Sequence, residues 1–497
     1  MSKDIEKAID IEKAIDLFFE LHDSDEKEKR KENIITKLLF DKNENELIET
    51  FDFLNQELSN NGYLLNLEKY DILSIAKKKF NTLGERKKEI WSKDVAIKFG
   101  HILKKIKKLL FLKKKIVDYN DIYYEDVKIL IYGKKFLLPK LNDFISNRIN
   151  IKLLAVGGNH TILLDNDGNV HTCGLNNFGQ LGLGHNEKRS NFQLVKYLKN
   201  KCTFISAGYA FSSIIINKKI YSCGAGENGR LGNLSMKDSN IFSECEINDE
   251  VDFYKVQCGS VHQVALTTEN ILFSCGNSDY TGHKKKKLTK RQRLIGISFL
   301  KRIDELKNIK FVQISIYSSG YHTLALTASG LLYSWGHNRV GQLGLGHNKL
   351  KVYEPSLVKS LSDKSIKYIN AGWGHSAVLD VYNNLYLCGR NTSGQLSFEK
   401  DSCLKNNEDQ LYVPYFTRFK IDNVKFVRCG YDQTNILTVN DSLFAYGSNN
   451  AGKLGCDISK IRLDNGESNT SCNIKKIFNK LVDIISTDDF TLIVYTD

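Results

Sequence analysis

A hairpin pattern that ends on glycine occurs six times between residues 156 and 447 of this 497-residue chain. Each copy has a run of β-favouring residues, a turn rich in Asp, Asn, Gly, Ser or Lys, and a second run that closes on an aromatic residue or Cys before Gly. A period near fifty residues, with room for about four short strands, predicts a β-propeller, because each small sheet must bury its faces against its neighbours. The closing glycines, 50 to 60 residues apart, are Gly174, Gly224, Gly276, Gly336, Gly389 and Gly447.

The two ends of the repeat region each hold half of such a unit. Residues 481–497 contain the first half, and residues 125–135 contain a strand that ends on Tyr-Gly. We expect residues 127–138 to complete the sheet of 481–497 as a seventh blade, because closing the ring removes exposed sheet edges. The predicted fold is an all-β seven-bladed β-propeller over residues 127–497, preceded by a separate α-helical extension over the first 126 residues.

The loop after the closing glycine has nearly the same sequence in two repeats. "GLNNFGQLGLGHN" starts at Gly174 and "GHNRVGQLGLGHN" starts at Gly336, and ten of the thirteen positions agree. We interpret this glycine-rich sequence as a turn between strands, with glycine at positions where the backbone is left-handed or crowded. We expect Leu181 and Leu343 to pack inward between blades.

Two segments match nucleotide-binding motifs by letter. "GAGENG" at 224–229 fits the dinucleotide fingerprint, and "GSNNAGK" at 447–453 fits the phosphate loop except for the Leu454 that follows it. Both stand in the frame of the glycine-rich turn, and neither precedes a helical pattern whose N-terminus would hold a phosphate. We interpret both as turns. "DNDGN" at 165–169 lacks the turn glycine of a calcium loop and is interpreted as a hairpin turn.

Together, the units "A-G-x-x-H … W-G-x-N-x-x-G-Q-L-G-x-G" resemble those of the regulator of chromosome condensation family of seven-bladed propellers. The resemblance covers roughly residues 127–497. The chain departs from the pattern at Phe211 and Gln433, which replace the histidine, and at "YTGHKKKK", which replaces G-Q-L-G in the third repeat. Cysteines stand where the fourth repeat has Trp335, and we interpret them as small buried hydrophobic residues. They are Cys173, Cys223, Cys275 and Cys388.

Four histidines recur at one position of the repeat. A residue that returns at the same place in each unit behaves as a determinant of the fold, so packing or a hydrogen bond between blades is favoured over catalysis. The four are His160, His262, His322 and His375.

Charge is distributed unevenly along the chain. Residues 1–60 hold nine Lys or Arg against 17 acids, whereas residues 77–115 hold 15 against three. A second basic cluster, between residues 283 and 293, consists of Lys284, Lys285, Lys286, Lys287, Lys290, Arg291 and Arg293. Such blocks attract nucleic acid, nucleosomes or acidic protein surfaces, and they also occur as plain solvated surface. Two interpretations are likewise open for residues 98–116: a docked helix with a wet basic face, or a basic amphipathic helix for acidic partners or a membrane surface.

Other features of the sequence argue against whole classes of protein. The eleven cysteines form no C-x-x-C pair, which argues against a zinc site and a disulfide scaffold. The chain has no apolar run of about 18 uncharged residues, and its first twenty residues carry charges throughout, so neither a membrane span nor a signal peptide is expected. We expect an intracellular protein, of the cytoplasm or nucleus, without a metal or cofactor.

The family resemblance implies a role in binding other proteins. The founding activity of that family is nucleotide exchange on the small GTPase Ran, with attachment to chromatin. It implies acidic side chains in turns on one face, after the first closing strand and just before the histidine. In this chain Lys134 and Lys135 follow the first closing strand, and the positions before the histidine hold Asn159, Ala210, Val261, Tyr321, Gly374, Asp432 and Asp489.

We therefore expect a non-catalytic protein-interaction scaffold, with exchange on a Ran-like GTPase as the alternative. The candidate partner-face residues are Asn159, Tyr321, Asp432 and Asp489.

Overall fold

A computed structural model describes most of the repeat region. The described residues are 128–133, 151–198, 201–284, 296–306, 308–450, 453–454, 471–474, 480–488 and 490–496. The chain divides into two compact units, 1–114 and 115–497, and the described residues all belong to the second. The predicted helical extension over residues 1–126 therefore lies outside the described residues, as do Asp489 and, in the basic cluster, Lys285, Lys286, Lys287, Lys290, Arg291 and Arg293.

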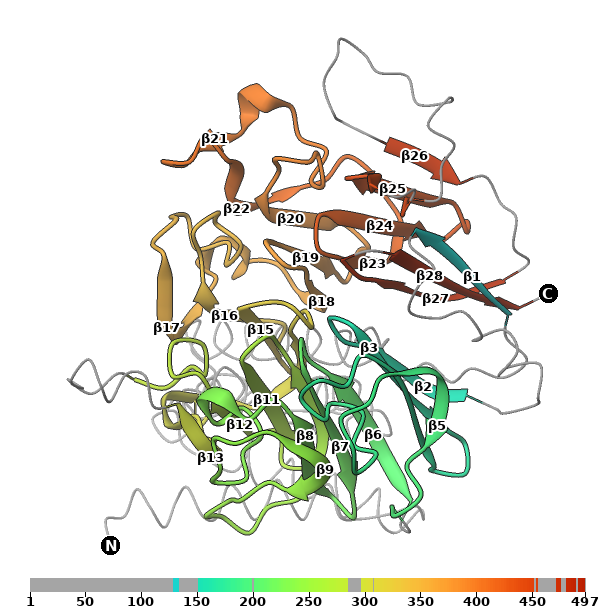
Figure 1. Cartoon of the computed structure of the whole chain (residues 1–497). Coiled ribbons are helices and arrows are strands. Elements are labelled where there is room, and N and C mark those ends of the chain that lie inside the picture. Colours follow the sequence, from blue (N-terminus) through green and yellow to red (C-terminus); the bar gives the residue numbers. More distant parts are fainter. Residues whose placement is uncertain are drawn as a thin grey trace, which may run out of the picture. The chain divides into compact units, whose positions relative to one another are not determined.

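The described chain folds into seven small antiparallel sheets, the blades of a β-propeller (Figure 1). Blade 1 has β2 (Ile151–Val156), β3 (His160–Asp165), β4 (Val170–Gly174) and β5 (Arg189–Leu194), and blade 2 has β6 (Cys202–Ala207), β7 (Phe211–Ile216), β8 (Lys219–Gly224) and β9 (Ser239–Glu244). Blade 3 has β10 (Phe253–Cys258), β11 (His262–Thr267), β12 (Leu272–Gly276) and β13 (Ile297–Arg302), and blade 4 has β14 (Phe311–Ser315), β15 (His322–Thr327), β16 (Leu332–His337) and β17 (Lys351–Leu357). Blade 5 has β18 (Ile366–Ala371), β19 (His375–Asp380), β20 (Leu385–Arg390), β22 (Leu411–Arg418) and the short outer β21 (Leu404–Lys405).

Blade 6 has β23 (Val424–Cys429), β24 (Gln433–Thr438), β25 (Leu443–Gly447) and β26 (Ser471–Ile474). The seventh sheet joins the two ends of the repeat region: β1 (Lys128–Gly133) pairs antiparallel with β28 (Phe490–Thr496), which pairs with β27 (Lys480–Ser486). Helical structure in the described part of the chain is limited to 3₁₀ turns: η3 (Glu227–Gly229), η4 (Asp304–Leu306), η5 (Lys359–Leu361) and η6 (Lys400–Ser402).

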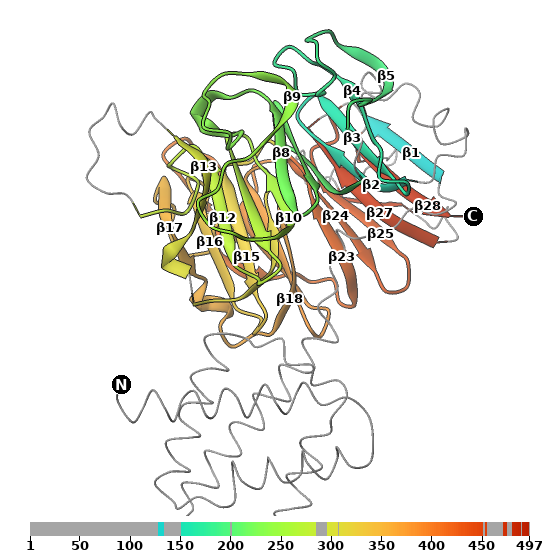
Figure 2. The ribbon, with the colours of Figure 1, turned by 90° about the horizontal axis from the view of Figure 1, so that it is seen from below.

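The first strands of all seven blades line a central cavity of about 180 Å³. Figure 2, which views the ring from below, shows the blades following one another in chain order around the ring. Polar side chains of the first strands link several blades to the next. The Ser206 hydroxyl accepts a bond of 3.0 Å from the Cys258 amide, and Ser315 accepts one of 2.9 Å from the amide of Ala371. The channel wall is therefore part of the packing between blades.

A hydrogen bond at the histidine position also links successive blades. His160 Nε2 lies 2.9 Å from the Ser212 hydroxyl of the next blade, and that hydroxyl donates to the carbonyl of Gln180. The imidazole nitrogen is therefore the donor. The same bond joins His262 to Thr323, His322 to Ser376 and His375 to Thr434, at 2.9 to 3.1 Å.

Burial sets the protonation state of these histidines. It lowers the pKa of His160 to about 4 and that of His262, His322 and His375 to about 3. Each imidazole is thus neutral at neutral pH, because the buried site disfavours the charged form.

Two blades have another residue at the histidine position, and the contact with the next blade differs between them. Gln433 in blade 6 keeps the bond between blades, since its amide donates to Thr491 of blade 7 at 3.1 Å. Phe211 in blade 2 has no donor, and the residue that would have accepted in blade 3 is Gln263. That Gln263 accepts from Ser213 and donates to the carbonyl of Arg230, both at 2.9 Å. A second polar network has replaced the first at this interface.

The closing glycines occupy a position that other residues would not tolerate. All six have φ between +104° and +113°. A Cβ on Gly174 would also meet the carbonyl oxygen of Asn159 at 2.5 Å, so both the backbone conformation and the lack of space require glycine.

The glycine-rich turn after the closing glycine packs against the next blade. A Cβ on Gly182 would meet the ring of Phe242 at 2.4 Å, and one on Gly344 would meet the ring of Phe416 at 2.3 Å. The Asn176 side chain braces the turn from inside, accepting from the Leu181 amide and donating to the carbonyl of His185. Leu181 and Leu343 are fully buried. The repeated glycine-rich sequence therefore forms the contact between blades.

Residue size accounts for the cysteine that replaces Trp335 in blades 2 and 5. In blades 2 and 5 the third strand contributes Cys223 or Cys388, and the fourth strand contributes the large ring that covers the turn, Phe242 or Phe416. In blade 4 the indole of Trp335 itself covers the turn, 2.9 Å from a Cβ position on Gly282. A small residue on one strand accompanies a large one on the other, and burial raises the pKa of the Cys388 thiol well above its usual value.

Candidate partner-binding face

One face of the propeller, here called the loop face, is formed by two loops from each blade. The first joins strands one and two and precedes the histidine position, and the second follows the closing glycine. The predicted partner-face residues lie in the first set. Asn159 and Tyr321 are half-buried there, and Asp489 lies beyond the described part of the chain.

Asp432 is held by a lysine of its own blade. Lys453, the last residue of the segment that matches a phosphate loop by letter, forms an ion pair with the Asp432 carboxylate. The same ammonium group donates to the carbonyl of Asp488 at 3.1 Å. The side chains of Lys453 and Asp432 are 3% and 14% exposed, so this pair lies largely out of contact with solvent. The lysine that a nucleotide would need is therefore occupied.

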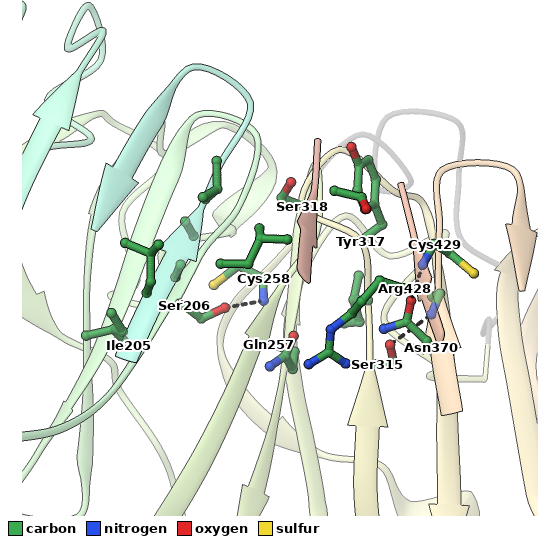
Figure 3. Close-up of a pocket in the computed structure, with 18 of the residues that line it drawn as sticks. Ile205, Ser206, Gln257, Cys258, Ser315, Tyr317, Ser318, Asn370, Arg428 and Cys429 are labelled. Carbon is green, nitrogen blue, oxygen red and sulfur yellow. Dashed lines mark hydrogen bonds between the residues drawn. The ribbon is translucent and has the colours of Figure 1, made fainter. Parts of the chain in front are cut away.

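The first loop of blade 4 is longer than the others. It runs from Ile316 to Tyr321, six residues, whereas the corresponding loops of the other blades have three. The extra length carries Tyr317 across the channel, where its hydroxyl donates to Asp488 of blade 7 at 2.6 Å. Ser319 donates to the same carboxylate at 3.3 Å. Figure 3 shows Tyr317 and Ser318 together at one end of the channel.

Aromatic rings from other first loops surround this bridge. Trp373 of blade 5 stacks on Tyr431 of blade 6 with ring centres 4.6 Å apart, and the Arg390 guanidinium lies over Trp373 at 5.4 Å. Burial and the carboxylates of Asp488 and Asp432 raise the pKa of Tyr431, while Arg390 lowers it. These groups therefore share one small region at the mouth of the channel.

On blade 2 the equivalent position is Tyr209. Its ring lies on Gly158 of blade 1, where an added Cβ would meet a ring carbon at 2.6 Å, and the residue is 46% exposed. We call Tyr209, Tyr317, Trp373, Tyr431 and Arg390 the mouth cluster. These residues are not among the partner-face residues predicted from the sequence. The middle position of the aligned first loops is aromatic in three blades, as Tyr209, Trp373 and Tyr431, and this recurrence would have indicated them.

The basic cluster emerges from the second loop of blade 3. That loop spans Asn277 to Gly296, twenty residues, whereas the corresponding loop of blade 1 has fourteen. His283, at its base, is buried and lies 2.9 Å from the Ser274 hydroxyl. The next residue, Lys284, is exposed, and its backbone amide donates to Glu305 at 3.2 Å. Of the basic cluster, Lys284 is therefore the residue that the structure describes, at the base of the loop.

Arg428, in the channel, donates to the carbonyl of Ile484 at 3.1 Å and to the Tyr368 hydroxyl. Across the described ranges, no group of three His, Cys, Asp or Glu residues is placed to hold a metal ion. A search of the same residues finds no helix with the length and apolar character of a membrane span.

Solved structures with the same fold support the description of the propeller. Prp20p from Saccharomyces cerevisiae is 22% identical, with a TM-score of 0.63 over 76% of this chain and 94% of that one. Human WBSCR16 is 18% identical, with a TM-score of 0.59 over 75% of this chain and 100% of that one.

Curated relatives match the repeat region at higher identity. The ultraviolet-B receptor UVR8 of Arabidopsis thaliana is 30% identical over 252 residues, 50% of this chain and 55% of the receptor. The probable human E3 ubiquitin-protein ligase HERC3 is 29% identical over 320 residues, 64% of this chain. The chain thus spans about half of the receptor's length and only 29% of the ligase. The pattern of the RCC1-like domain matches residues 128–493, about three quarters of the sequence. With that match and the seven-bladed ring, the chain belongs to the RCC1-like domain family.

Proposed function

We propose that this chain is a non-catalytic scaffold that binds a protein partner through its loop face. The observation that carries the proposal is the mouth cluster. Trp, Tyr and Arg are the residues most enriched at the energetic centres of protein interfaces. Here Trp373, Tyr431 and Arg390 are stacked against one another, which fixes their rotamers before a partner arrives. Less conformational entropy is then lost on binding.

The way the polar groups of the propeller are used supports binding over catalysis. The repeated histidines are neutral and bonded between blades, and Lys453 is paired with Asp432. A general base or nucleophile needs a pKa near neutrality and access to a substrate. The buried histidines have neither property.

The alternative is nucleotide exchange on a Ran-like small GTPase. It is supported by the fold shared with Prp20p, a protein that binds Gsp1p and histones. Against it, the positions that the family resemblance would give to acids hold Ala210 and Val261, both without charge, and Asp432 is tied to Lys453. An exchange factor must bind the empty GTPase more tightly than the loaded one, which requires groups that compete for the magnesium or phosphate site.

A nucleotide-release assay separates the two functions. A Ran-type GTPase from the same organism, loaded with a fluorescent nucleotide, should release it at the same rate with and without micromolar full-length chain. Clear acceleration that is lost in an Asp432→Ala, Asp489→Ala double variant would establish exchange. Binding of the GTPase without acceleration would agree with a scaffold.

Chromatin or nucleic-acid contact through the basic loop of blade 3 is compatible with either function, in the cytoplasm or the nucleus. Neutralising all seven basic residues from Lys284 to Arg293 should leave stability unchanged and weaken binding to DNA or nucleosomes. The dependence of log K on log salt should become shallower, because the variant neutralises fewer phosphates and so releases fewer counterions. If salt-dependent binding survives unchanged, the basic segment 77–115 becomes the candidate.

A further inference from the structure

One position on the fourth strand supplies an apolar side chain in five of the blades. The strand register defines this position. In each blade, the third-strand residue two places before the closing glycine pairs with a residue of the fourth strand. The position described here is the fourth-strand residue that comes just before that partner. In blades 2 and 5 this residue is the phenylalanine whose ring covers the glycine-rich turn of the preceding blade. From blade 1 to blade 6 the position holds Phe192, Phe242, Leu300, Pro355, Phe416 and Ser471.

Blade 6 is the exception, because its residue is Ser471. The third strand partly compensates with a larger residue, Tyr446, which is buried and packs edge-to-face on Phe419 with ring centres 5.4 Å apart. The preceding turn differs as well. Ser397, at φ +51°, stands where the turns of blades 1 and 4 have Gly182 and Gly344. The contact between blades 5 and 6 therefore lacks the phenylalanine that covers the turn between blades 1 and 2 and between blades 4 and 5.

A groove of about 610 Å³ begins at Ser397 and is lined by residues of blade 5 and of the connection from β22 to blade 6. Its apolar wall consists of Phe398, Val413 and Phe419, and Phe398 packs edge-to-face on Phe419 at 6.1 Å between ring centres. The volume is within the range of ligand-binding pockets, about 300 to 1,000 Å³, which are lined mainly by apolar and aromatic side chains. The two phenylalanines and the valine of the wall suit an aromatic ring.

The rim of the groove carries two basic residues and one acid, a small excess of positive charge. Lys420 is exposed at its edge, and Arg418, which is 60% exposed, pairs with Asp422 and donates to the Asn384 side chain. Charges of this sign favour an acidic ligand near the apolar wall. We propose that the groove binds a short acidic peptide of a partner protein by accepting one of its aromatic side chains. This site goes beyond the loop face, since it is built from other residues on the rim of the ring.

Peptide selection on the full-length chain tests the proposal. A displayed library of random dodecapeptides should yield sequences that share an aromatic residue beside Asp or Glu. The affinity of the best peptide, measured by fluorescence anisotropy, should fall about tenfold when its aromatic residue is changed to Ala, the effect of losing one buried ring. It should fall about threefold or more with Lys420→Glu, the effect of reversing a rim charge. Lys359→Glu, on an exposed lysine of the blade 4 connection, is the matched control and should change nothing.

A second variant fills the groove from within. Ser397→Gly with Tyr446→Cys and Ser471→Phe restores the pattern of blades 2 and 5, a small third-strand residue beside a fourth-strand phenylalanine, and should abolish peptide binding, whereas Trp373→Ala on the loop face should leave it unchanged. Selected peptides without an aromatic residue, or affinities indifferent to Lys420→Glu, would overturn the proposal. Peptide binding that appears only after deletion of residues 456–469 would overturn it too, because the occupant would then be this chain itself. Loss of binding with Trp373→Ala would also overturn it, by assigning the peptides to the loop face.

Discussion

The Tyr317 hydroxyl of blade 4 donates a hydrogen bond of 2.6 Å to the carboxylate of Asp488 in blade 7, on the far side of the channel. The bond therefore ties the lengthened loop of blade 4 to the blade that contains both ends of the repeat region. Burial and this carboxylate raise the pKa of Tyr317 well above its usual value, so the phenol keeps its proton.

Removing the hydroxyl should loosen the ring at its closing blade. Tyr317→Phe deletes a buried bond to a charged acceptor, a change that costs about 1 to 3 kcal/mol. Equilibrium unfolding in urea measures it. Tyr415→Phe, on a tyrosine that is 53% exposed, is the control and should stay within about 0.5 kcal/mol of the wild type. Equal stability of the two variants would mean that the bridge adds nothing to closure.

The ring should lose stability in acid because of the histidines between blades. Their folded-state pKa values are lowered to about 3 or 4, below the unfolded value near 6.5, so the unfolded chain binds more protons between these limits. Stability is therefore complete above about pH 6.5 and falls as the pH drops toward 4, by about 1.4 kcal/mol per pH unit for each histidine.

Replacing a histidine with glutamine, the residue that blade 6 already has at this position, tests whether the histidines cause the loss of stability in acid. His322→Gln should keep the bond between blades, as Gln433 does in blade 6, and remove one titrating group. Melting temperatures measured from pH 7 to pH 4.5 should fall less steeply in the variant. Parallel curves for variant and wild type would assign the acid sensitivity to other groups.

The interface between blades 2 and 3 should show coupling between two departures from the repeat. Phe211→His places an imidazole where Gln263 offers no hydroxyl acceptor, and Gln263→Thr alone breaks bonds to Ser213 and Arg230. Combined, they recreate the histidine–threonine pair of blades 3 and 4. A double-mutant cycle should give a favourable coupling of about 1 kcal/mol or more, within the range for residues in contact. Additive losses would contradict the pairing.

The boundary of the propeller can be tested by truncation. β1 pairs with β28 over six residues, so deleting residues 1–139 removes a strand from the closing sheet. We expect that variant to unfold without cooperativity, whereas deleting residues 1–120 should leave a single sharp transition in calorimetry. Equal melting of both variants would show that the ring does not need β1.

Much of this fold follows from spacing in the sequence. The closing glycines, the hairpins and the seven sheets are all encoded by a local pattern that returns about every fifty residues, so each unit predicts the next. The pairing of Asp432 with Lys453 was not predictable in the same way, because it depends on how one loop folds back on another. The contact between Tyr317 and Asp488 depends on the ring as a whole, since 171 residues separate the two in the chain.

The partner face could be predicted only in part. Sequence alignment of the units locates the first loops and hence Asn159, Tyr321 and Asp432. Which of their side chains stack, and which are neutralised, depends on neighbours from different blades. Trp373 shows this clearly: its ring stacks on Tyr431 of the next blade, and only the assembled ring brings these two first loops together.

The most direct test of binding through the loop face is a comparison of bound partners for two variants of the full-length chain. Tyr209→Ala with Trp373→Ala removes two rings of the mouth cluster, and Tyr382→Ala removes a ring that is 73% exposed in the hairpin between β19 and β20, at the opposite end of its blade. Each is used to capture proteins from the same cell extract, with quantitative mass spectrometry against the wild type. We predict that the specific partners of the wild type are lost from the first variant and retained by the second. Partners retained by the first variant and lost from the second would contradict binding through the loop face.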